Sequence, residues 1–265
     1  MPGLESADTW DAQTYVSFPD ERTRPLLDLL ARVGATAPKV MVDLGCGNGS
    51  GMAELARRWP TARMVGVDSS ADMLAAAAME LGPDSAATLI RADAQSWTPP
   101  TTFDVVVSNA LLQWIPGHAD LLTRMAGWLG PAGWLAMQVP GNFDAPSHTL
   151  LRELAGSPKW TERLGGVLRG ADSVSDAAEY FQILTDAGLI VDAWETTYLH
   201  VLTGPDPVLR WTSGTALRPV LAVLDEADAA EFTAEYAGML LRAYPADHAG
   251  RVLFPFRRIF AVGHR

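Results

Sequence analysis

The first part of the chain alternates between short apolar runs and longer amphipathic segments. Runs of the kind that form buried strands lie at residues 39–44, 63–68, 87–92, 103–109 and 133–139. Apolar residues recur at helical spacing over residues 20–33, 51–59, 71–82 and 117–129. Strands that alternate with helices in this way are typical of a doubly wound α/β fold with a mostly parallel sheet.

The rhythm changes after residue 140. Helical patterns predominate, at residues 146–155, 175–187, 206–213 and 226–243. Only residues 189–201 and 252–263 have the pattern of strands. We expect these two late strands to complete a seven-stranded sheet and the helices between them to form a lid.

A glycine loop follows the first apolar run. Asp43 lies near the end of the run, and Gly45, Gly47 and Gly49 occupy alternate positions directly before an apolar helix. Glycine lacks a Cβ and therefore lets the backbone approach a ligand closely. The spacing does not fit the G-x-G-x-x-G motif of dinucleotide sites, and it lacks the lysine of a P-loop. Taken alone, the loop is also compatible with an ordinary glycine-rich turn.

Polar residues also follow the next three strands. Asp68 closes the second strand, at the distance from the loop typical of a carboxylate that accepts hydrogen bonds from two ribose hydroxyls. Asp93 and Asn109 end the third and fourth strands. Ligands of open parallel sheets lie beyond the carboxyl ends of the strands. One such residue would be a solvated loop residue, but four together indicate a nucleoside-bearing cofactor.

The glycine loop with Asp68 resembles the first motifs of the S-adenosylmethionine-dependent methyltransferases. The resemblance implies a Rossmann-like methyltransferase fold and S-adenosyl-L-methionine as the cofactor. It also places Asp93 at the adenine amino group and Asn109 and Ala110 below the methyl donor. The cofactor-binding residues expected on this basis are Asp43, Gly45, Gly47, Gly49, Asp68, Ser69, Met73, Asp93, Asn109, Ala110 and Trp114.

Three regions with different roles are expected. Residues 1–36 form an N-terminal helical segment that contributes to the active site. Residues 37–140 form the S-adenosylmethionine-binding core, and residues 141–265 form the helical lid together with the last strands.

Composition restricts the partners. The 265 residues carry a formal net charge of −11, which disfavours binding to nucleic acid and to anionic membranes. The start lacks the apolar run of a secretory leader, and no segment is apolar enough to span a membrane. The single cysteine, Cys46, fits a reducing compartment, and the five histidines lack metal-ligand spacing. We expect a cytoplasmic, monomeric protein without a metal.

Further motifs resemble the trans-aconitate methyltransferase family along nearly the whole chain. They lie at Trp10–Tyr15, Glu21–Pro25, Gln113–Pro116, Gln138–Phe143, Val191–His200, Leu217–Pro219 and Phe254–Arg258. The cofactor motifs are common to many methyltransferases, whereas the later motifs are more particular and therefore bear on the substrate. The sequence departs from the family at Asn48, where many members have proline, and residues 156–173 match least well.

The resemblance implies methyl transfer to one carboxylate of a small polycarboxylic acid, with trans-aconitate first, to give a monomethyl ester. A carboxylate is ionised at pH 7, so no dedicated base and no catalytic residue is expected. Positioning and exclusion of water would carry the reaction. The carboxylates that do not react need cations, and arginine binds them bidentately. The expected substrate-binding residues are Tyr15, Arg22, Arg24, His148, Tyr198, Trp211, Arg218 and Arg257.

Each of these residues also has a simpler explanation. The arginines can be ordinary surface residues, Tyr198 and Trp211 can pack inside the lid, and His148 can belong to a helix cap. Arg218 is the strongest single candidate. Two other functions stay open: a methyltransferase of the same fold that acts on an O, N or C atom of another metabolite, and a non-enzymatic S-adenosylmethionine-binding module. Several arginines in the substrate pocket would favour the polycarboxylate.

Overall fold

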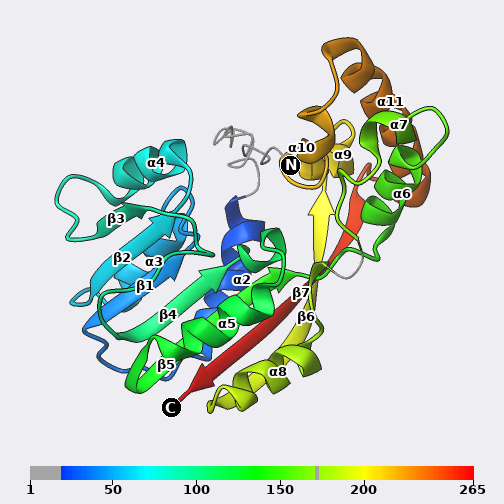
Figure 1. Ribbon diagram of the computed structural model, residues 1–265. Helices are drawn as coiled ribbons and strands as arrows, with labels where there is room; N and C mark the ends of the chain where they lie inside the picture. Colours follow the sequence, from blue (N-terminus) through cyan, green and yellow to red (C-terminus); the bar gives the residue numbers. More distant parts are fainter. Residues whose placement is uncertain (1–18, 171–172) are drawn as a thin grey trace. The chain divides into compact units, whose positions relative to one another are not determined.

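The computed structural model describes residues 19–170 and 173–265 (Figure 1). Tyr15 and the motif at residues 10–15 lie outside the described residues. The chain divides into two compact units. The described residues of the first, the sheet unit, are 19–140, 174–196 and 258–265. Those of the second, the helical unit, are 141–170, 173 and 197–257.

The described residues form a seven-stranded sheet with the order β3-β2-β1-β4-β5-β7-β6. Its strands are β1 (Val40–Leu44), β2 (Arg63–Asp68), β3 (Thr88–Arg91), β4 (Phe103–Asn109), β5 (Leu129–Pro140), β6 (Ile190–Leu202) and β7 (Val252–His264). Strands β1 to β5 pair in parallel, and β7 is antiparallel to β5. The predicted doubly wound, mostly parallel sheet of seven strands is therefore confirmed.

Helices cover both faces of the sheet unit (Figure 1). They are α2 (Pro19–Ala31), α3 (Ser50–Arg58), α4 (Ala71–Leu81), the 3-10 turn η1 (Leu112–Trp114), α5 (His118–Gly127) and α8 (Ala177–Asp186). Helix α3 contacts both α2 and α4, whereas α5 and α8 contact each other. The start of α4 is capped by Ser70, which accepts a hydrogen bond from the Met73 amide, and α8 begins with a capping box between Asp176 and Glu179.

The helical unit contains α6 (Pro146–Ala155), α7 (Thr161–Leu164), α9 (Pro207–Ser213), α10 (Arg218–Leu221) and α11 (Glu226–Ala243), together with parts of β6 and β7. Helix α11 contacts α6 and α9. Two tyrosines join α11 and its end to α6, because the Tyr236 hydroxyl donates to the Ser147 carbonyl at 2.5 Å and the Tyr244 hydroxyl accepts from the Ser147 amide at 3.0 Å. Trp160 is fully buried and its ring lies edge-on to Phe232 of α11.

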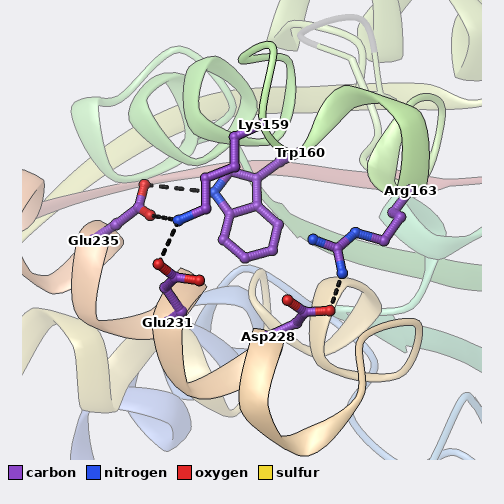
Figure 2. Close-up of polar contacts among 6 residues, drawn as sticks. All are labelled: Lys159, Trp160, Arg163, Asp228, Glu231 and Glu235. Carbon is purple, nitrogen blue, oxygen red and sulfur yellow. Dashed lines mark hydrogen bonds and ion pairs between the residues drawn. The ribbon is translucent and has the colours of Figure 1, made fainter.

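Charged groups surround Trp160 (Figure 2). Lys159 pairs with Glu231 and Glu235, and Arg163 pairs with Asp228. Both cations also lie over the Trp160 ring, at 4.6 Å and 4.9 Å from its centroid. Exposed ion pairs contribute only about 0–1 kcal/mol each. The buried indole therefore accounts for most of the stabilisation between residues 159–163 and α11.

Three details differ from the sequence-based predictions. The fifth strand, expected at residues 133–139, begins at Leu129, because that residue already pairs with Phe103. The added residues include a register shift in the pairing of β4 with β5, and Ala132 has a φ of +59°. The short helices α7 and α10 were not predicted, because four residues are too few for a periodic pattern.

One buried hydrogen bond joins α8 to α5. The Tyr180 hydroxyl lies 2.8 Å from Nε2 of His118, and it also accepts from the Ser175 amide at 3.3 Å. Replacing Tyr180 by phenylalanine would leave both groups without this partner. We expect Tyr180→Phe to lower the free energy of unfolding by about 1–3 kcal/mol in a denaturant titration. A change below about 0.5 kcal/mol would mean that water replaces the hydroxyl without penalty.

Candidate active site

The glycine loop between β1 and α3 depends on backbone that other residues rarely adopt. Gly45, Gly47 and Gly49 all have positive φ, and a Cβ on Gly49 would lie 2.8 Å from the Cα of Ala77. A Cβ on Gly47 would meet nothing within 4 Å. The loop therefore packs tightly against α4 at Gly49 and leaves open space at Gly47, where a ligand can approach the backbone.

Asp68 holds this loop to the end of β2. Its Oδ2 accepts a hydrogen bond from the Gly47 amide at 2.9 Å, and its Oδ1 accepts one from the Ser70 amide at 2.9 Å. Both carboxylate oxygens can accept more than one hydrogen bond. Asp68 can therefore hold the loop and still receive donors from a ligand.

Asp43 is a buried carboxyl beside the same loop. Its side chain is 5% exposed, and a Cβ on Gly51 would lie 3.1 Å from its Oδ2. Burial, and to a lesser extent the negative charge of Asp68, raises the pKa of Asp43 to about 7. Near neutral pH this group therefore changes charge easily, and a cation nearby would ionise it.

Asn109 and Gln138 lie on the same face of the sheet as Asp43. Asp43 pairs with Val107, and Asn109 pairs with Gln138. Side chains alternate along a strand, so Val107 and Asn109 share a face. The ends of β1, β4 and β5 thus present a row of polar side chains at the carboxyl edge of the sheet.

Several polar atoms at this edge are buried without a hydrogen-bond partner. They are Oδ1 of Asp43, Oγ of Ser108, Oδ1 of Asn109, Oε1 of Gln113 and Nε2 of Gln138. A buried polar atom without a partner costs about 1–3 kcal/mol. A polar ligand at the edge would supply the missing partners, so their concentration here favours a binding site.

The remaining cofactor candidates also lie in the loops beyond the strands. Asp93 is exposed after β3 and accepts a hydrogen bond from the Gln95 amide at 2.8 Å. Ala110 follows β4 with a φ of +58°, and its amide donates to the Gln138 carbonyl at 2.9 Å. Ser69 is exposed, Met73 is buried in the first turn of α4, and Trp114 is half-buried in η1. These residues therefore follow the carboxyl ends of strands β2, β3 and β4.

The Cys46 thiol in the glycine loop is not an activated nucleophile. Burial, with the charges of Asp43 and Asp68, raises the pKa of the Cys46 thiol, so the thiol stays protonated. Among the described residues, no group of three histidine, cysteine or acidic side chains could hold a metal ion. Within the same residues, no helix is long and apolar enough to cross a membrane.

The substrate candidates of the helical unit fall into two groups. Tyr198 and Trp211 are 4% and 2% exposed and belong to an aromatic cluster with His200, Phe254 and Phe256.

His148, Arg218 and Arg257 are partly exposed. Arg218 begins α10, and the Arg257 amide donates to Oδ1 of Asn142 at 2.7 Å. These three side chains can therefore reach a ligand.

The structure says less about the two substrate-binding candidates of α2, Arg22 and Arg24. Arg24 is exposed on α2 and forms an ion pair with Asp28 at 3.9 Å. Arg22 lies in the same helix, but its side chain is outside the described residues.

Sequence reasoning missed two buried polar residues of the sheet unit. Gln138 is fully buried, and its Oε1 accepts from Nη1 of Arg258, which is 6% exposed, at 3.4 Å. Gln138 stands in the motif Gln138–Phe143, and Arg258 follows Arg257 in the last one. A polar pair inside two otherwise apolar strands was the signal that could have revealed them.

Comparisons with known proteins agree on the fold and the family. Residues 41–133 match the methyltransferase domain family. The chain is 52% identical over 262 residues to the trans-aconitate 2-methyltransferase of Streptomyces avermitilis, and the match covers 97% of both chains.

Two solved structures share the fold. The YcgJ protein of Bacillus subtilis has a TM-score of 0.61 at 13% identity and covers 92% of this chain and 98% of its own. The phosphoethanolamine N-methyltransferase 2 of Haemonchus contortus, in complex with S-adenosyl-L-methionine, has a TM-score of 0.52 at 20% identity, covering 91% of this chain and 52% of its own. At these identities the likeness establishes the fold alone. The relative at 52% identity, by contrast, spans nearly the whole chain, and the chain therefore belongs to the trans-aconitate 2-methyltransferase family.

Proposed function

We propose that this chain transfers a methyl group from S-adenosyl-L-methionine to a carboxylate of trans-aconitate, giving a monomethyl ester. The observation that carries the proposal is the 52% identity to a trans-aconitate 2-methyltransferase over 97% of the chain. The fold alone would not choose this substrate, because one fold serves many different activities. The chain is proposed to work as a cytoplasmic monomer.

The carboxyl edge of the sheet suits an adenosyl cofactor. Asp68 can accept from the ribose hydroxyls, and the open space at Gly47 admits a ligand close to the backbone. Asp43, Asn109 and Gln138 offer buried polar atoms that lack partners. Residues 37–140 are the proposed cofactor-binding core. Residues 1–36 are proposed to contribute to the active site, and residues 141–265 are the proposed helical lid together with the last strands.

The proposed reaction needs no general acid or base. The bound cofactor supplies a methyl group on a cationic sulfur. The acceptor carboxylate has a pKa near 4, so it is already ionised at neutral pH and no residue has to remove a proton. The protein's contribution is to align the oxygen with the methyl group and to exclude water, and such positioning can contribute about 7–11 kcal/mol.

Charge decides which acceptor fits. Trans-aconitate has three carboxylates and only one reacts, so the others need cationic partners in a protein of net charge −11. The proposed partners are Arg218, Arg257 and His148 of the helical unit, with Tyr15, Arg22, Arg24, Tyr198 and Trp211 as further candidates. A neutral metabolite would not need such partners.

Turnover with a labelled methyl donor and a panel of organic acids tests the proposal directly. We expect trans-aconitate to have the highest kcat/KM. At saturating substrate, the single-turnover rate should be nearly independent of pH from about 6.5 to 8.5, because no base is needed. Preferred turnover of a phenol or amine, with a rate that climbs with pH, would instead support a different metabolite as substrate. Donor binding without any turnover would support a binding module.

Removal of Asp68 should weaken donor binding. Asp68→Ala removes charged hydrogen bonds of about 1.5–3 kcal/mol each and releases the Gly47 amide. The affinity for S-adenosyl-L-methionine, measured by calorimetry, should fall at least about tenfold. Asp84→Ala removes the same charge at an exposed position after α4 and is the matched control. Equal affinities of the two folded variants would exclude Asp68 from the donor site.

Donor affinity should also depend on pH through Asp43. Its pKa of about 7 means that the carboxyl is largely neutral below neutrality, whereas a cationic ligand favours the ionised form. Affinity for S-adenosyl-L-methionine should therefore rise as pH increases from about 6 to about 8, and binding should release a proton.

Calorimetry in buffers of different ionisation enthalpy measures that proton. Asp43→Asn should abolish the release, and S-adenosylhomocysteine, which lacks the sulfonium charge, should show a smaller effect. Proton release that persists in Asp43→Asn would assign it to another group.

A further inference from the structure

Four basic side chains gather around the short segment Gly141–Phe143 of the helical unit. Two of them bond to its backbone: Nη2 of Arg152 donates to the Phe143 carbonyl at 2.6 Å, and Nη1 of Arg257 donates to the Gly141 carbonyl at 3.4 Å. The side chain of Asn142 bonds to both the amide and the carbonyl of Arg257. The segment therefore has a defined position relative to both arginines.

The other two basic groups lie beside the Phe143 ring. The guanidinium carbon of Arg169 is 5.5 Å from the ring centroid, and the His148 ring is 5.4 Å from it. Nδ1 of His148 is 3.1 Å from Oγ of Ser147. Arg152, Arg169 and His148 are all partly exposed, whereas Phe143 is buried. Two basic groups of α6 and one of a later segment thus surround one buried aromatic side chain, and each of them is partly exposed.

The charges of Arg152 and Arg169 act on the His148 ring. Desolvation and then the charges of Arg152 and Arg169 lower the pKa of His148 to about 4, so the imidazole is neutral at pH 7. Burial lowers the pKa of Arg169 to about 10, which still leaves it charged. A neutral imidazole beside two guanidinium groups offers N–H donors of three side chains to an anion.

Other basic side chains of the helical unit have different bonding partners. Lys159 and Arg163 point at the carboxylates of Glu231, Glu235 and Asp228 (Figure 2). The bond of Arg152 described above goes to a carbonyl oxygen instead. A carbonyl oxygen orients a guanidinium group but carries no net charge to cancel that of the arginine.

We propose that Arg152, Arg169 and His148 form an anion subsite that holds a carboxylate of the substrate that does not react. The inference rests on the proposed function and adds Arg152 and Arg169 to its substrate-binding residues. A planar guanidinium matches a carboxylate bidentately, and the Phe143 ring shields one side of Arg169 from water. The subsite would make the enzyme favour acids that carry a second carboxylate.

Binding without turnover tests the subsite. Trans-aconitate is titrated by calorimetry into protein saturated with S-adenosylhomocysteine, at constant ionic strength. Arg169→Gln and Arg152→Gln should each weaken binding at least about tenfold. Arg169→Lys, which keeps the charge but not the planar fork, should recover only part of the loss. Arg242→Gln, at an exposed position of α11, removes the same charge and should have no effect.

Selectivity separates recognition from a structural role. The three monoamides of trans-aconitate each replace one carboxylate by a neutral group of the same shape. The wild type should discriminate against the monoamide that lacks the bound carboxylate, and Arg169→Gln should lose at least about tenfold of that discrimination in kcat/KM with an unchanged donor affinity. A structural defect would lower kcat/KM for all acids alike and would overturn the proposal.

The two proposals fail differently. Normal wild-type turnover of trans-aconitate, with unchanged binding and selectivity in Arg169→Gln and Arg152→Gln, would overturn the subsite alone. A wild type that methylates only neutral acceptors would overturn the proposed function and the subsite together.

Discussion

The hydrogen bond from the Gly47 amide to the Asp68 carboxylate is the interaction on which the candidate site depends. It joins the loop after β1 to the end of β2, and the same carboxylate receives the Ser70 amide at the start of α4. One side chain thus fixes two loops that come from different strands. The glycines permit the loop conformation, but the carboxylate selects it from the many conformations that glycine allows.

The carboxyl edge of the sheet is stable as a whole, although several of its polar atoms lack partners. Asp43, Asn109 and Gln138 lie at the ends of strands whose other residues are almost all buried and apolar. Each of these polar groups costs about 1–3 kcal/mol, and this cost is offset by the burial of many apolar residues in the same sheet, such as Val42, Val106 and Leu135. Strand cores of this kind can therefore tolerate a polar end that is poorly satisfied without a ligand.

The sheet and its glycine loop could be predicted from the sequence because both depend on local patterns. Apolar runs predicted the strands, and the spacing of Asp43 and Asp68 around the glycines predicted the edge on which they lie. The proposed anion subsite could not be predicted from such local patterns. Arg152 lies four positions after His148 on α6, so helix geometry alone brings these two together. Arg169 comes close to His148 only through packing of a distant segment, and it stands in an irregular stretch without a periodic pattern. Helix α8 belongs to the sheet unit through the contact of Tyr180 with His118, 62 positions away in the chain.

The two tyrosine contacts at the start of α6 have a consequence for how the sequence can vary. Tyr236 and Tyr244 bond to the carbonyl and the amide of Ser147, so they recognise the backbone of that residue and not its side chain. Any residue other than proline at position 147 presents the same two groups, provided that it fits the buried space. The tyrosines have no such freedom, because each supplies a hydroxyl that phenylalanine lacks. We therefore expect position 147 to accept more substitutions than Tyr236 and Tyr244 during evolution.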